Sequence, residues 1–388
     1  MKITFVLEHA DLAGGIRVVA IYANRLKQRG HEVVVVSTPR RPQDWVFAAK
    51  TVLRGRPLPK RYPKNGPSHI DGAGVEHRVT RRWGPVTDAD VPDADVVVAT
   101  WWETAEWVAG LSRSKGAKAY LIQHHELTFQ GQPTERVAAT WRSPLHKIVI
   151  SKWLKELATD TYGDTDVSHV PNSVDMRQFH APPRGKQPVP TVGMLYSATP
   201  FKGCDVSLEA IRLASMHVPG LRLVTFGSAR LEPCLPLPAG ARYTYCPPQD
   251  KIREEYARCD VWLCGSRSEG FHLTPLEAMA CRCPVVSTHV GGPMDTVREG
   301  INGHLVEIDD APALADRLQR VLTLPDDQWL AMSDAAYSTA TSYTWDDATV
   351  LFEAALQRAI EKTDRTPRYL AGAGQRFSLG VGAAAGAH

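Results

Sequence analysis

Two glutamates separated by seven residues occur in the stretch "GSRSEGFHLTPLEAMACRCPVV" (265–286). Glu269 lies in a glycine-flanked loop, and Glu277 lies just inside an expected helix. In a ligand with a diphosphate at its centre, Glu277 could accept hydrogen bonds from the two hydroxyls of a ribose at one end. Glu269 could then bind hydroxyls of the group at the other end of the diphosphate. A structural hypothesis competes with this one: Thr274 caps the helix, Pro275 opens it and Glu277 completes a capping box. The helix start by itself leaves both hypotheses open.

The residues just before this helix offer a second kind of chemistry. "EGFHL" leads from the strand-like "VWLCG" into the helical "PLEAMA". The first amides of a helix have no partner within it, and they attract anions. The amides of residues 272–274 therefore predict an anion site suited to a diphosphate. The candidate binding residues of this segment are Phe271, His272, Leu273 and Thr274.

The composition is typical of a soluble globular protein. The chain has 388 residues, of which 43% are hydrophobic and 22% are charged, so two domains of ordinary size can each bury a core. A formal charge of +3 is too small to indicate nucleic-acid binding, and no apolar run approaches the length of a membrane span. The opening "MKITFVLEHA" has too short an apolar run for a signal peptide, so we expect a cytosolic chain.

The seven cysteines all lie in the second half of the sequence. Their spacing fits neither a zinc site nor a secreted disulfide framework. We expect reduced cysteines in the core and on helices. They are Cys204, Cys234, Cys246, Cys259, Cys264, Cys281 and Cys283.

Short apolar runs alternate with helical patterns along the chain, which predicts an α/β fold with two doubly wound, Rossmann-like domains. Proline, glycine and charge interrupt both patterns at 181–190, so we expect domains at 1–182 and 191–343. Ligands of such sheets bind at the carboxyl ends of the strands, so the two domains should face each other across one cleft. The expected strands are 2–8, 31–38, 95–100, 119–123, 146–151 and 167–171, then 191–197, 221–228, 241–246, 261–266, 284–290 and 304–308.

Three segments stand outside this alternation. Residues 40–64 hold eight basic residues and one acidic residue, with aromatic and aliphatic residues interleaved. Such a mixture could contact an anionic membrane surface, or it could be a solvated insertion over the cleft. Residues 344–362 form a long amphipathic helical pattern. Residues 363–388 lack periodicity, and we expect them to be disordered.

The span 260–308 resembles the nucleotide-sugar-binding core of the family-4 retaining glycosyltransferases of the GT-B fold. The glutamate pair is common to both, and so is the order of Ser-x-x-Glu-Gly-Phe, Leu-Glu-Ala-Met-Ala, Pro-Val-Val, Gly-Gly and Asn-Gly. Weaker similarity extends to about residue 362 and includes "LAGGIRVVA" (12–20) and "GMLYSATPFKGCD" (193–205).

The resemblance implies a role for several further residues. Lys202 would bind the donor's phosphates, and Gly14 and Gly15 would allow donor and acceptor to approach closely. His124 or His125, at a strand end, would orient the donor sugar, and the sequence does not decide between them. The terminal helix 344–362 would pack back on the first domain.

Four positions depart from the family's pattern. Met194 stands where an arginine that contacts the diphosphate is usual, and His272 and Arg282 stand where glycine is common. Asp295 replaces a glutamate after the Gly-Gly pair. Lys202 and the amides of 272–274 still suffice to hold a diphosphate.

The repeated "DAD" at 88–90 and 93–95 looks like a carboxylate site for a metal. The second copy leads directly into a predicted strand, so we interpret it as a polar strand entry. We expect no metal and no cofactor other than the nucleotide diphosphate sugar as co-substrate.

The resemblance therefore predicts a metal-independent hexosyltransferase that moves a sugar from a nucleotide diphosphate to a hydroxyl acceptor with retention. Its acceptor would be a saccharide, a lipid-linked saccharide or a small molecule, as in the synthesis of surface polysaccharides, glycolipids or natural-product glycosides. No nucleic-acid partner is expected, and contact with the inner face of a membrane would involve 40–64. A nucleotide-sugar epimerase and an inactive sugar-nucleotide-binding protein are the alternatives. The base, the sugar, the acceptor and the linkage are not predicted.

Overall fold

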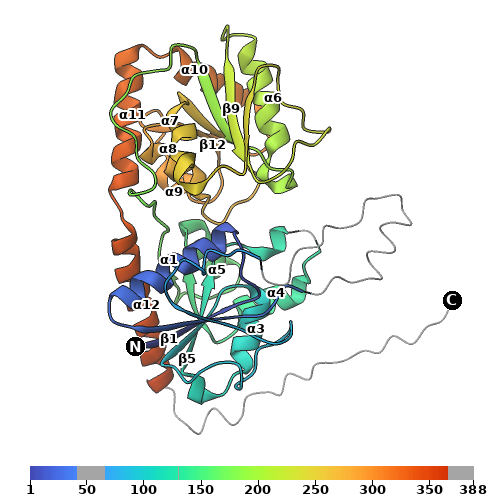
Figure 1. Cartoon of the computed structure of the whole chain (residues 1–388), viewed down its shortest axis with the longest axis vertical. Coiled ribbons are helices and arrows are strands. Elements are labelled where there is room, and N and C mark those ends of the chain that lie inside the picture. Colours follow the sequence, from blue (N-terminus) through green and yellow to red (C-terminus); the bar gives the residue numbers. More distant parts are fainter. Residues whose placement is uncertain (42–65, 130, 366–388) are drawn as a thin grey trace, which may run out of the picture.

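The computed structural model describes residues 1–41, 66–129 and 131–365 (Figure 1). Most of the basic segment 40–64 and the tail from 366 lie outside the described residues, so the expectations for them stay untested. In the described part of the chain, no helix is long and apolar enough to cross a membrane.

Two parallel sheets form the two halves of the molecule. The first sheet has the strand order β3-β2-β1-β4-β5-β6-β7, and the second has the order β10-β9-β8-β11-β12-β13. This arrangement confirms the predicted α/β fold with two doubly wound, Rossmann-like halves. The strands of the first half are β1 Lys2–Leu7, β2 Glu32–Ser37, β3 Glu76–Val79, β4 Val96–Ala99, β5 Ala117–Ile122, β6 His146–Val149 and β7 Ser168–His169. Those of the second are β8 Thr191–Leu195, β9 Arg222–Gly227, β10 Arg242–Tyr245, β11 Val261–Cys264, β12 Val285–Thr288 and β13 Gly303–Val306.

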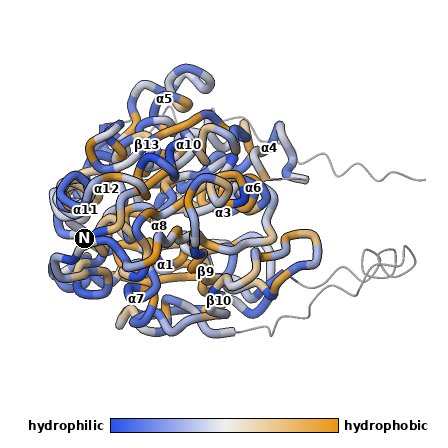
Figure 2. The backbone as a smooth tube through the Cα atoms, turned by 90° about the horizontal axis from the view of Figure 1, so that it is seen from above, coloured by the Kyte–Doolittle hydropathy of each residue, from blue (hydrophilic) through white to orange (hydrophobic). Residues whose placement is uncertain are grey.

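Helices cover both sheets. The central strands β4 and β11, with the sequences "VVVA" and "VWLC", are wholly apolar, as expected for strands buried on both faces. In Figure 2 the hydrophobic stretches of the chain gather inside the molecule, and the hydrophilic ones lie mostly toward its outside. The helices of the first half are α1 Gly14–Gln28, α3 Trp102–Gly110, α4 Thr134–Trp141 and α5 Lys152–Asp160. Those that follow are α6 Cys204–Ser215, α7 Ile252–Ala257, α8 Leu273–Ala280, α9 Pro293–Thr296, α10 Ala311–Thr323, α11 Asp326–Thr341 and α12 Trp345–Arg365.

The last helix, α12, returns to the first half (Figure 1). Phe352 stacks on Tyr22 with ring centroids 4.2 Å apart, and it lies 6.0 Å from the ring of Phe5. Thr344 and Asp347 form a reciprocal capping pair at the helix start. The helix extends to Arg365, so residues 363–365 belong to α12 and not to the expected tail; the basic side chains of Lys362 and Arg365 suit its last turn.

Strand β3 was not predicted. Its sequence, "EHRV", contains a single apolar residue and lies largely exposed at the edge of the first sheet. An edge strand of this kind buries too little surface to leave an apolar run in the sequence.

All seven cysteines are free, and five of them are buried; Cys234 and Cys246 are instead exposed outside the helices, so the expectation of core and helix positions is wrong for these two. Burial raises the pKa of the Cys283 thiol to about 12, which keeps it protonated and unreactive at neutral pH.

Candidate functional site

The candidate residues lie in loops that follow the central strands of both sheets. In each sheet the strand order reverses between two neighbours, β1 and β4 in the first and β8 and β11 in the second. Lys202 follows β8, and Glu269 follows β11. The carboxyl ends of strands at such a reversal are where doubly wound sheets bind ligands. In Figure 1 the loops around α8 and α9 face α1 and α5 across the junction of the halves.

Glu269 and Lys202 form a partly buried ion pair. The Lys202 Nζ donates to both carboxylate oxygens of Glu269 at 2.9 Å, and the Ser266 hydroxyl donates to Oε1 at 2.8 Å. The Glu269 side chain is only 5% exposed. Burial by itself would raise the pKa of Glu269, but the nearby positive charge and these hydrogen bonds outweigh it and lower the pKa. Glu269 is therefore an anion at neutral pH.

A glycine places Lys202 beside this loop. Gly203 has a φ of +55° and caps the start of α6. A Cβ atom at this position would lie 1.7 Å from the carbonyl oxygen of Gly265. Close approach of the two loops, and with it the ion pair of Lys202 and Glu269, therefore requires glycine here.

His272 is the N-cap of α8 and adopts a left-handed conformation, with φ at +70°. This region favours glycine, the residue that the resemblance implies at this position. Burial, opposed by the charge of Glu269, lowers the pKa of His272 to about 4, so its ring is neutral at pH 7. Lys202 and Ser266 are then the groups that keep Glu269 ionised. Within the described residues the His272 Nδ1 is buried without a hydrogen-bond partner.

His124 faces the junction of the halves. Its ring packs on Phe129 and Phe201, with centroids 4.7 and 6.0 Å away, and burial lowers its pKa. The Thr128 hydroxyl donates its proton to the His125 carbonyl. His124 Nδ1 lies 3.2 Å from each of these two oxygens, so it must carry a proton in order to bond them. The ring also interacts with the backbone of Ser268, which lies in the loop that carries Glu269.

His125 points into the first half. Its Nε2 lies 2.9 Å from the Tyr162 hydroxyl, and its ring meets Trp141 edge-on. Of the two histidines that the sequence left undecided, the structure places His124 toward Glu269 and His125 away from it.

The loop that carries Glu269 is pressed against the first half. The Gly270 carbonyl accepts hydrogen bonds from the Ser151 hydroxyl and the Trp153 ring, both at 2.9 Å. A Cβ at Gly270 would lie 1.7 Å from the carbonyl oxygen of Gln123, so this contact requires glycine. Asp295 adds a further link between the halves, because it accepts from the Lys152 amide at 3.0 Å.

Glu277 does not cap the helix. Helix α8 begins at Leu273, with His272 as N-cap and no side-chain cap, so Thr274 lies within its first turn. The Glu277 carboxylate instead accepts from the Tyr256 hydroxyl at 2.8 Å and from Arg17 at 2.9 Å. The capping-box hypothesis is therefore wrong, and Glu277 is a buried carboxylate at the junction.

The remaining predicted residues surround this arrangement. Phe271 is buried, while Leu273 and Thr274 are half-buried at the start of α8. Gly14 is exposed at the start of α1, and a Cβ there would meet open space. Gly15 is half-buried, and its carbonyl accepts from the Gln123 side chain at 3.1 Å.

Two of the departures from the family pattern have a clear structural place. Met194 is buried in β8 within the core of the second half, so this position supplies no cation. Arg282 has a φ of +61°, another position that favours glycine. Its guanidinium compensates by bonding the carbonyl of Ala181 and the carboxylate of Asp334.

No group of three or more metal-ligating side chains is found among the described residues. Asp93 and Asp95 of the second "DAD" copy precede β4 at its amino end. Asp95 accepts from the Lys2 amide at 2.7 Å, and Asp93 pairs with Lys115 at 2.8 Å. They act as polar strand entries.

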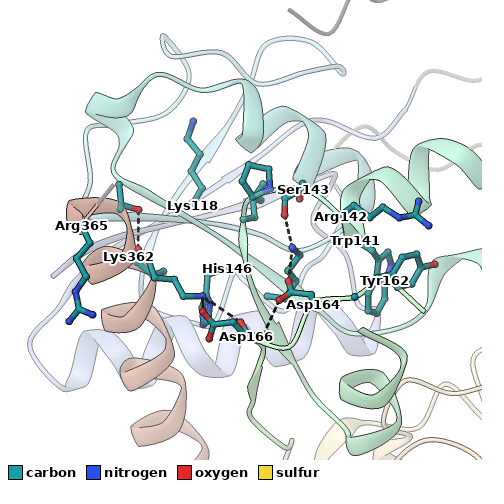
Figure 3. A pocket seen from close by; sticks show the side chains of 16 residues that line it. Lys118, Trp141, Arg142, Ser143, His146, Tyr162, Asp164, Asp166, Lys362 and Arg365 are labelled. Atoms are coloured by element: carbon teal, nitrogen blue, oxygen red, sulfur yellow. Dashed lines mark hydrogen bonds and ion pairs between the residues drawn. The ribbon is translucent and has the colours of Figure 1, made fainter. Parts of the chain in front are cut away.

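A cavity of about 800 Å³ lies at this same amino edge of the first sheet (Figure 3). It is bounded by residues 142–147, the turn 162–166 and the end of α12. Lys147 pairs with Asp164 at 2.8 Å, and Lys362 pairs with Asp166. None of the predicted site residues lines this cavity, so it is separate from the candidate site.

Sequence reasoning missed two residues of the site, Arg17 and Tyr256. Arg17 could have been noticed, because a cation in the first turn of α1 opposes the helix dipole and suggests a partner elsewhere. Tyr256 is wholly buried in α7, and nothing in its sequence surroundings distinguishes it from a core tyrosine.

Comparison with known sequences places both halves in glycosyltransferase families. The family described as "Glycosyltransferase Family 4" matches residues 13–178, and the one described as "Glycosyl transferases group 1" matches residues 187–324. Together with two facing Rossmann-like sheets, these matches define a glycosyltransferase of the GT-B fold. The chain belongs to the family-4 glycosyltransferases.

Curated relatives include the D-inositol 3-phosphate glycosyltransferase of Mycolicibacterium paratuberculosis, 34% identical over 177 residues. The alignment spans 42% of this chain and 39% of that relative. The corresponding protein of Mycobacterium tuberculosis is 32% identical over 176 residues, spanning 42% of this chain and 35% of the relative. The chain thus matches about two fifths of the length of these relatives.

Solved structures share the fold over nearly the whole chain. Sucrose-phosphate synthase of Thermosynechococcus elongatus has a TM-score of 0.70 at 16% identity and covers 93% of this chain and 100% of its own. Anabaena Alr3699/HepE, solved in complex with UDP-glucose, has a TM-score of 0.66 at 17% identity and covers 94% and 100%. At this identity the likeness concerns the fold alone.

Proposed function

We propose that the chain transfers a sugar from a nucleoside diphosphate donor to a hydroxyl acceptor with retention at the anomeric carbon. The observation that carries this proposal is the placement of two buried carboxylates, Glu269 and Glu277, on either side of the start of α8, with Lys202 bonded to the first. This arrangement suits a ligand with hydroxyls at both ends and phosphates between them.

The second half would hold the donor. Glu277 would accept from the ribose hydroxyls, and the amides at the start of α8 would meet the diphosphate. An ammonium group has three donors, and two of those on Lys202 are used by Glu269, which leaves one for a phosphate oxygen. Because Met194 supplies no cation, Lys202 carries more of this electrostatic work than in relatives with the usual arginine.

The reaction would proceed on one face of the sugar. The acceptor oxygen forms a bond to the anomeric carbon while the bond from that carbon to the phosphate oxygen breaks. The departing phosphate oxygen takes the acceptor's proton, so the products are the glycoside and the nucleoside diphosphate. Preorganised donors around the departing diphosphate would supply the main stabilisation of the transition state.

Glu269 would position and polarise the donor sugar rather than attack it. Its carboxylate is bonded to Lys202 and Ser266, both of which reduce its nucleophilicity. His124, which lies beside the loop that carries Glu269, would orient the donor sugar through a hydrogen bond from its ring. No metal is invoked in this proposal, because Lys202 and the helix amides provide the positive potential.

The direct test is the thermal stability of the protein with a panel of nucleoside diphosphates and their sugars. UDP and UDP-glucose come first, because a structural neighbour was solved with the latter. Binding raises stability by RT ln(1 + [L]/Kd), so a donor at 100 times its Kd contributes about 2.7 kcal/mol. Glu277→Ala and Lys202→Ala should each lose this gain, and Glu209→Ala, an exposed carboxylate of α6, should keep it. Absence of any stabilisation across the panel would refute the proposal.

A turnover assay separates the transferase from the two alternatives named above. An epimerase would consume the donor without an acceptor, and an inactive protein would bind it without turnover. An inositol phosphate belongs in the acceptor panel, because curated relatives are named for that acceptor. We expect consumption of the donor to depend on the acceptor that is added.

A further inference from the structure

Arg17 bridges the two halves of the molecule. From the first turn of α1, its Nη1 donates to Glu277 Oε1 at 2.9 Å. Its Nη2 donates to the side-chain oxygen of Gln178 at 3.1 Å, and the guanidinium lies over the Phe179 ring at 5.2 Å. Three groups therefore fix this side chain, and one of them is the carboxylate assigned to the donor's ribose.

The bridge occupies the Glu277 carboxylate, the group assigned to the ribose, and shields it from solvent. The side chains of Arg17 and Glu277 are 18% and 7% exposed. The second carboxylate oxygen already accepts from Tyr256 at 2.8 Å. Removing one member of a buried pair leaves the other charge without compensation, so the bridge resists rupture unless a ligand takes its place.

Neighbouring contacts close the same region. Ser151 and Trp153 hold the Gly270 carbonyl, and the adjacent Glu269 side chain is only 5% exposed. The first half thus covers Glu277 directly, through Arg17, and it lies against the loop that carries Glu269. A ribose can reach the Glu277 oxygen that Arg17 occupies only after Arg17 has moved away.

We propose that the bridge between Arg17 and Glu277 holds the ligand-free protein closed, and that the ribose of an entering donor must displace Arg17. This inference rests on the proposed function, because it assigns a competitor to the same carboxylate. It makes Arg17 an autoinhibitory residue on the acceptor-side half. Donor binding and opening of the halves are then linked.

The link has a measurable consequence. When only a fraction of the molecules is open, the apparent affinity for the donor falls by that fraction. Arg17→Gln keeps a polar side chain but removes the charge, so the open fraction should rise. Coupling between sites commonly amounts to about 5- to 150-fold in affinity. We expect the Kd of Arg17→Gln for UDP to be lower than that of the parent by a factor within this range.

Two measurements on the full chain test the proposal. Small-angle X-ray scattering without nucleotide should show a larger radius of gyration for Arg17→Gln than for the parent. Glu277→Gln should show the same expansion, and the double variant should add nothing, because all three lack the same bridge. Arg25→Gln is the matched control, since Arg25 lies on the same helix but pairs with Asp346 of α12. Calorimetric titration with UDP then compares the parent with Arg17→Gln and Arg25→Gln.

The scattering experiment tests, without any nucleotide, whether the bridge holds the two halves together. An unchanged radius in both Arg17→Gln and Glu277→Gln would overturn the proposal, and so would weaker or equal UDP binding by Arg17→Gln. If Arg17→Gln fails to fold, Glu277→Gln reports the same contact from its other end. If neither parent nor variant binds UDP or any other nucleotide, the proposed function fails, and the scattering still decides whether the bridge closes the molecule.

Discussion

His272 should make the protein both less stable and sensitive to mild acid. Its φ of +70° lies in the left-handed region, which costs a residue with a Cβ about 1–2 kcal/mol. Glycine would avoid this cost but would lose about 0.5–1 kcal/mol through its greater freedom in the unfolded chain. We therefore expect His272→Gly to raise the free energy of unfolding by about 1 kcal/mol at neutral pH.

The dependence on pH follows from the same residue. Burial lowers the pKa of His272 from 6.5 to about 4, so the unfolded chain binds a proton more readily than the folded one. Stability is thus lost as the pH falls through 6.5, and the loss ends near pH 4. Integrating proton binding over this window gives a loss of about 2 kcal/mol at pH 5 for the parent. The free energy of unfolding of His272→Gly should therefore exceed that of the parent by about 1 kcal/mol at neutral pH and by about 3 kcal/mol at pH 5.

Urea unfolding at pH 7.5 and pH 5, followed by circular dichroism, measures both effects. The transitions of the two halves should be fitted separately, because such a chain need not unfold in one step. His272→Asn is the control, since asparagine tolerates the left-handed conformation but does not titrate here. The free energy of unfolding of His272→Asn, relative to that of the parent, should also increase toward low pH. Equal losses on acidification for the parent and both variants would refute the assignment of a buried, neutral His272.

Three further predictions concern packing and support of the site. Phe352→Ala should lower the free energy of unfolding of the first half by about 3–5 kcal/mol in urea titrations, and a loss below about 1 kcal/mol would mean that α12 contributes little. Gly203→Ala should weaken UDP binding in calorimetry, because its Cβ would lie 1.7 Å from the Gly265 oxygen. Unchanged affinity would show that the two loops need not approach so closely. Tyr256→Phe removes a hydrogen bond to Glu277 and should cost about 1.5–3 kcal/mol in thermal or chemical unfolding; no loss would speak against that bond.

Most of the framework could be predicted from the sequence, because buried parallel strands leave continuous apolar runs. The strand β4, with the sequence "VVVA", is an example. Strand β3 left no such run, because it lies at an exposed edge.

The details of the site were harder to predict, because they depend on contacts between distant residues. His124 and His125 are consecutive at the end of β5, and neighbouring side chains of an extended chain point to opposite sides, so the fold decides which one faces the junction. Glu277 meets Arg17 across 260 positions of sequence. The capping-box hypothesis failed for a local reason, because the left-handed His272 starts α8 before Thr274.

The chain passes between the halves twice, first through 181–190 and again between α11 and α12. In Figure 1 both passages lie on the side of the molecule where α12 runs. Two covalent connections on one side form a double-stranded hinge, which permits rotation about the line that joins them and resists twisting. The halves should therefore rotate apart about this hinge, so that the cleft opens on the side opposite α12. They should return to the same alignment each time they close.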